Sequence, residues 1–139
     1  MKYQISIKAI VLGVATDVVG SIIIAFLVAF AAAAAHRSVY SVVGTSSPIA
    51  FLACVTASGL ALTFVGGFVA GRVSPWRKMF HGSIVGIIAL VIDLLERNSP
   101  EPHWSRAATL LLAVPAGMLG GAIAARKGTP EAIGNELGK

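Results

Sequence analysis

The sequence predicts an all-α integral membrane protein, a four-helix bundle with both termini in the cytoplasm. Of its 139 residues, 56% are hydrophobic and only 12% are charged, whereas a soluble domain carries about 25% charged residues. Four apolar runs, separated by short polar connections, come close to the roughly 20 residues that a helix needs to cross a hydrocarbon core. This composition argues against a soluble enzyme, a secreted mini-protein or a disordered tail.

The predicted spans cover about residues 9–35, 49–71, 80–95 and 107–125. With their connections they form a transmembrane domain over residues 1–127, and residues 128–139 are expected to be a polar cytoplasmic tail. The first run is 27 residues long and contains Asp17, whereas the apolar core of a signal peptide has about 7–15 uninterrupted residues. The run is therefore expected to remain as the first membrane helix.

The positions of lysine and arginine predict the orientation of the spans. With the N-terminus inside, eight basic residues lie on the cytoplasmic side and three outside. The eight are Lys2, Lys8, Arg72, Arg77, Lys78, Arg126, Lys127 and Lys139, and the three are Arg37, Arg97 and Arg106. This asymmetry predicts a multi-pass protein of the bacterial inner (plasma) membrane with both ends in the cytoplasm.

This orientation can be tested with a reporter fused after Lys139. A reporter that is active only in the cytoplasm is expected to be active there, because an even number of spans returns the chain to the side on which it starts. A reporter at Lys139 that faced the periplasm would overturn the whole topology.

Small residues are expected to hold the helices together, because they let backbones in a membrane approach closely. In the first span a ridge of small or polar residues includes Gly13, Asp17, Ser21 and Ala25, spaced every fourth residue. The glycines predicted to pack helices are Gly13, Gly59, Gly67, Gly71, Gly82, Gly86, Gly117 and Gly121. Their contacts are expected within one chain, with contact between two copies as the alternative.

Two segments suggest an internal duplication. The stretches 66–72 (GGFVAGR) and 120–126 (GGAIAAR) are identical at four of seven positions. Two like-oriented helical hairpins, related by an axis along the membrane normal, would explain this similarity. The alternative is composition alone, because helices rich in glycine and alanine match one another easily.

The sequence GGFVAGR, a basic turn and then HGSIVG cover residues 66–86. This segment resembles small, uncharacterised four-span bacterial membrane proteins. The resemblance implies a helical bundle and carries no activity or catalytic residue onto this chain.

Polar residues inside the spans are the candidates for function, since an acid at the centre of a membrane helix costs about 2.5–3.5 kcal/mol to insert. Asp17 lies on the small-residue ridge. It could be a protonatable carboxyl, bond Thr63 or a freed backbone group, or reach Arg72 or Arg126. A second acid, Asp93, is expected either to pair with Arg97 near the interface or to face an ion pathway.

Apart from these acids, the sequence contains no recognisable catalytic or metal-binding motif. No two histidines have the i, i+4 spacing of a helical metal site, and the serines lack a nucleophile motif. We therefore expect no catalytic residue, no cofactor and no metal. Membrane lipids are expected partners, and nucleic acid is not. The residues expected to contact lipid headgroups are Arg72, Arg77, Lys78, Arg126 and Lys127.

These features favour a non-enzymatic inner-membrane protein, a packing or accessory subunit for which self-association through the glycine and alanine faces is the alternative to packing within one chain. The alternative is a small proton-linked transporter or channel that uses the intramembrane carboxylate Asp17.

Overall fold

The computed structural model describes residues 5–34, 49–95 and 102–126. Within these ranges the chain forms four helices and no strand. Helix α1 spans Ile7–Ala34, α3 spans Ile49–Val73, α4 spans Lys78–Leu95 and α5 spans His103–Arg126. The bounds agree with the predicted spans to within four residues, and each helix is long and apolar enough to cross a membrane. The predicted tail, 128–139, lies outside the described residues.

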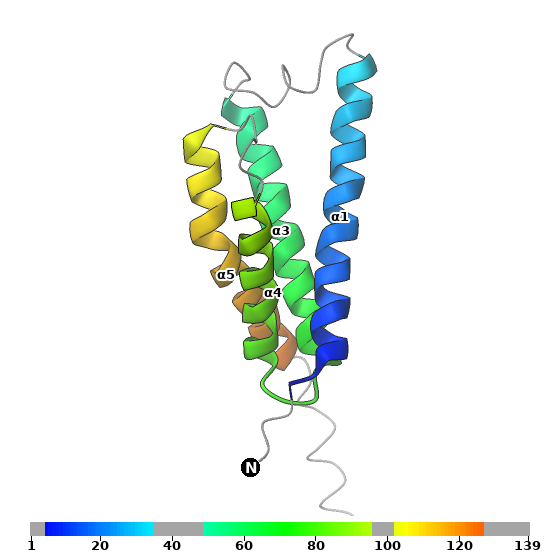
Figure 1. Cartoon of the computed structure of the whole chain (residues 1–139), viewed down its shortest axis with the longest axis vertical. Helices are drawn as coiled ribbons and strands as arrows, with labels where there is room; N and C mark the ends of the chain where they lie inside the picture. Colours follow the sequence, from blue (N-terminus) through cyan, green and yellow to red (C-terminus); the bar gives the residue numbers. More distant parts are fainter. Residues whose placement is uncertain (1–4, 35–48, 96–101, 127–139) are drawn as a thin grey trace, which may run out of the picture.

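The four helices form one bundle in which consecutive helices run in opposite directions (Figure 1). The N-terminal ends of α1 and α4 and the C-terminal ends of α3 and α5 therefore lie at the same end of the bundle. The predicted orientation would make this the cytoplasmic end. Helix α5 continues through Pro115.

Close backbone contacts, each made at a glycine, hold α3, α4 and α5 together. A β-carbon added to Gly67 of α3 would overlap the backbone of Gly117 in α5, and so would one added to Gly82 of α4. A β-carbon on Gly120 would overlap the backbone of Phe64. Other approaches of this kind join Gly86 to Ala113, Gly71 to Gly121, and Gly121 to Lys78. These contacts are the close approach that membrane helices achieve through small residues.

Helix α1 packs less closely than the other three. It lies mainly against α3, contacts α4 less, and touches α5 only marginally. Near its start, a β-carbon on Gly13 would lie 2.7 Å from the carbonyl oxygen of Gly66. Further along the same ridge, Ser21 and Ala25 are exposed, and α1 diverges from α4 and α5 toward its C-terminal end (Figure 1).

Large apolar side chains cover the outside of the bundle. Phe26, Phe30 and Leu111 are each about three-quarters exposed, whereas the buried side chains are mostly small. A water-soluble bundle buries its large apolar residues. The reversed pattern matches a bundle whose outer surface contacts lipid tails.

The two similar segments of the possible duplication lie against each other. Gly67 and Gly71 of α3 contact Gly117 and Gly121 of α5. The two hairpins differ in their packing, however, because α3 packs on α4 whereas α1 touches α5 only marginally. The duplication therefore stays a prediction.

Candidate functional site

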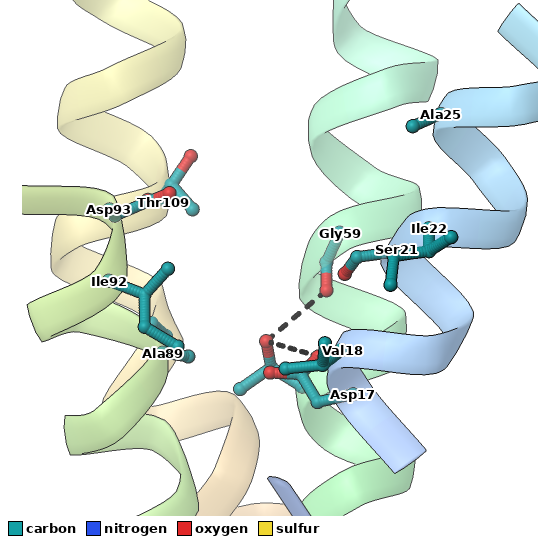
Figure 2. Close-up of a pocket in the computed structure, with 12 residues that line it drawn as sticks. Asp17, Val18, Ser21, Ile22, Ala25, Gly59, Ala89, Ile92, Asp93 and Thr109 are labelled. Atoms are coloured by element: carbon teal, nitrogen blue, oxygen red, sulfur yellow. Dashed lines mark hydrogen bonds between the residues drawn. The ribbon is translucent and has the colours of Figure 1, made fainter. Parts of the chain in front are cut away.

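A cavity of about 370 Å³ lies among the four helices and opens to the outside of the bundle, because several of its lining residues are exposed. Each helix contributes to its wall (Figure 2), and the lining residues of α1 follow Gly13 in the sequence. Its lining residues are Asp17, Val18, Ser21, Ile22, Ala25, Gly59, Thr63, Ala89, Ile92, Asp93, Thr109 and Ala113. We call this cavity the carboxylate pocket, because two acidic side chains line it.

Asp17 is buried, with 8% of its surface exposed. Its Oδ1 accepts a hydrogen bond from the Thr63 hydroxyl of α3 at 3.3 Å. The same hydroxyl lies 3.3 Å from the carbonyl oxygen of Gly59, and its single proton serves the two acceptors (Figure 2). This confirms one of the three roles predicted for Asp17, the bond to Thr63. Arg72 and Arg126, its other predicted contacts, do not line the pocket.

Asp93 reaches the same pocket from α4. The structure places it and Asp17 on opposite sides of the cavity (Figure 2). The Arg106 guanidinium donates to the backbone carbonyl oxygen of Asp93 at 3.4 Å, which joins α4 to α5. Arg97, the partner expected from the sequence, lies outside the described residues. Asp93 lines the cavity, and both of its predicted roles, pairing with Arg97 and facing an ion pathway, stay predictions.

The pocket combines acid, hydroxyl and apolar groups. Ser21, Thr63 and Thr109 add three hydroxyls to the two carboxylates, and the rest of the wall is aliphatic or glycine. Among the described residues, no lysine, arginine or histidine lines it. Such a site can hold protons on its carboxyls. Two ionised carboxylates facing one cavity repel each other, which favours binding of a positive charge between them.

Gly59 differs from its sequence prediction. It was expected to pack against another helix, yet a β-carbon there would meet nothing within 4 Å. It lines the carboxylate pocket instead. Its four-residue spacing with Thr63 and Gly67 places all three on one face of α3, but the neighbouring helices do not approach that face at Gly59. The other seven predicted glycines each lie within 3 Å of a neighbouring helix when a β-carbon is added.

The basic residues expected at lipid headgroups gather at one end of the bundle. Arg72, Arg77 and Arg126 are exposed and Lys78 is half-buried, and all four lie at the end where α3 meets α4 and α5 stops (Figure 1). Lys127 lies outside the described residues.

A second polar cluster, which the sequence analysis did not single out, lies at the same end. His81 of α4 and Ser74, which follows α3, are each 2% exposed. The ring of His81 accepts the backbone N–H of Ser6 at its Nε2, 3.0 Å away. The sequence gives no local signal for this bond, because the two partners lie 75 positions apart.

Four long apolar helices that pack through glycines and expose their large side chains define a multi-pass helical membrane protein. The chain belongs to the DUF3792 family, described as a protein of unknown function, and the family model matches residues 6–124. This range includes all the lining residues of the carboxylate pocket. Comparison with curated proteins and with solved structures gives no match.

Proposed function

We propose that this protein is a small, non-enzymatic transport protein of the inner membrane that moves protons across the bilayer through the carboxylate pocket. The observation that carries the proposal is that Asp17 of α1 and Asp93 of α4 line one cavity. Acids inside spans are rare because they are costly to insert, and those that are present mark proton relays and ion pathways. The bond to Thr63 ties Asp17 to α3, but it does not account for a second acid on the same cavity.

The position of Asp17 suits proton transfer. Its Oδ1 is held by Thr63, and the pocket continues past it toward Ser21 and Thr109. Hydroxyls can both donate and accept a proton, so they can connect Asp17 to Asp93 through water held in the cavity. Because α1 packs less closely than the other three helices, it can change position as a proton moves.

Proton flux into proteoliposomes tests the proposal. Wild-type protein with a pH-sensitive dye inside and an inside-negative diffusion potential is expected to acidify the interior faster than protein-free liposomes. Asp17→Asn keeps the size of the side chain and removes its ionisable proton, so the flux is expected to fall to the level of protein-free liposomes. Asp93→Asn is expected to lower it strongly as well.

A matched control is Glu131→Gln, the same change of acid to amide in the predicted cytoplasmic tail. It is expected to leave the flux at the wild-type level. Equal flux in wild type and Asp17→Asn would contradict the proposal.

The packing or accessory role is the second candidate. It is favoured by the exposed part of the α1 ridge at Ser21 and Ala25, which a helix of another protein could cover. Self-association through the glycine faces is less favoured, because seven of the eight glycines contact neighbouring helices of the same chain. A protein that copurifies in mild detergent, together with unchanged flux in Asp17→Asn, would favour this second role.

A further inference from the structure

We propose that His81 is a proton-sensitive latch that fixes the start of α1 to the turn between α3 and α4. In the neutral state of its ring the latch is closed, and protonation of Nε2 opens it. The inference concerns the position of α1 and is independent of whether the carboxylate pocket carries protons.

The hydrogen bonds around His81 assign one form of its ring. The Ser74 hydroxyl donates its proton to the carbonyl oxygen of Trp76 at 2.6 Å. Its oxygen is then an acceptor for Nδ1 of His81, which lies 3.0 Å away. Nδ1 therefore carries the proton, and the carbonyl oxygen of Arg77 is a further acceptor at 3.2 Å. Nε2 is left unprotonated and accepts the N–H of Ser6.

This arrangement cannot survive protonation. A second proton on the ring would sit on Nε2 and face the N–H of Ser6, so that two donors would point at each other. The link between Ser6 and α4 must then break. Histidine is the side chain that ordinarily changes charge between pH 5 and 8.

The bond from Ser6 to His81 joins the N-terminal cap of α1 to the turn that precedes α4. Ser6 caps the N-terminus of α1, because its side chain and its carbonyl both accept N–H groups of the first turn. On the other side, Arg77 has a left-handed backbone with φ of 45°, which costs a non-glycine residue energy. Its carbonyl oxygen accepts from Phe80 and His81, and these bonds hold the turn in that conformation.

The charged groups described at this end of the bundle are all basic. They are Lys8 of α1, Arg72 of α3, Arg77 and Lys78 at the start of α4, and Arg126 of α5. A protonated ring that stayed buried here would gain no ion pair from any of them to replace the lost bond to Ser6.

The structure also indicates which element would move. Helix α1 packs mainly on α3 and touches α5 only marginally. Near the latch Gly13 packs closely on Gly66, and beyond that point most of the α1 residues that line the carboxylate pocket are exposed. Release of Ser6 therefore frees the helix with the weakest packing.

Spin labelling in lipid nanodiscs tests the latch. A single nitroxide replaces Ile7, which is 73% exposed at the start of α1, in a background where the exposed Cys54 is alanine. With wild-type His81, the label is expected to give an immobilised electron paramagnetic resonance spectrum at pH 8 and an additional mobile component at pH 5. In His81→Gln, whose amide oxygen accepts a hydrogen bond and does not titrate, the spectrum is expected to be the same at both pH values.

A label at Leu111, which is 74% exposed on α5, serves as a control and is expected to be insensitive to pH. An unchanged Ile7 spectrum in wild type would overturn the proposal, and so would an equal change in His81→Gln. ¹⁵N NMR of the imidazole gives a test that needs no variant. It is expected to show the Nδ1–H form at pH 8, with a titration midpoint equal to that of the Ile7 label. The Nε2–H form, or a different midpoint, would contradict the latch.

Discussion

Replacing Gly67 by alanine is expected to disrupt the bundle, whereas the same replacement at Gly59, about two turns away on α3, is expected to leave it intact. At Gly67 the added methyl group would lie 2.8 Å from the Cα and carbonyl carbon of Gly117, and nearer still to its carbonyl oxygen. These are backbone atoms, which cannot rotate aside, so α3 and α5 must separate. At Gly59 the methyl group meets nothing within 4 Å.

The two variants should therefore shift stability in opposite directions. Gly67→Ala is expected to lose at least the roughly 1–3 kcal/mol that overpacking usually costs. Gly59→Ala is expected to gain about 0.5–1 kcal/mol, because alanine is the better helix former. Denaturation in detergent, followed by helical circular dichroism, measures both. Equal stability of the two variants would mean that α3 and α5 do not pack as described.

Filling the carboxylate pocket from Gly59 is expected to abolish proton flux without unfolding the protein. Gly59 lines the cavity and has open space around its missing side chain. A leucine there would place an aliphatic group next to Asp17 and Thr63, inside a cavity of about 370 Å³, and would exclude the water that proton transfer needs. Flux through Gly59→Leu in proteoliposomes should fall to the level of protein-free liposomes.

Gly59→Ala is the matched control, because it changes the same position and leaves most of the cavity open. It is expected to retain flux, and both variants are expected to keep the helical content of the wild type. Full flux through a folded Gly59→Leu variant would show that protons do not pass through this cavity.

Much of the fold could be predicted from the sequence, because a membrane helix is defined by a local property. The length and hydropathy of the four runs placed all four helices, and the excess of small residues predicted close packing. The residues at which α4 and α5 begin were less predictable. Lys78 and His103 are polar and were left outside the spans, but the helices begin at these residues.

The candidate site could be predicted only in part, because it depends on how far apart the helices are. The four-residue spacing puts Gly59 and Gly67 on one face of α3, yet only the structure shows that Gly67 meets α5 while Gly59 borders a cavity. The sequence offers Asp93 only charges nearby in the chain, whereas the structure places it on the same cavity as Asp17, which lies 76 positions earlier. The bond from Ser6 to His81 was missed for the same reason.

Chemical labelling of the two acids gives the most direct test of the carboxylate pocket. An apolar carbodiimide added to the protein in lipid converts accessible protonated carboxyls in apolar surroundings to stable acylureas, which mass spectrometry can locate. We predict labelling of Asp17 and Asp93 in the wild type, and loss of that labelling in Gly59→Leu. Labelling confined to the other acids, or equal labelling of Asp17 in the two proteins, would contradict the account.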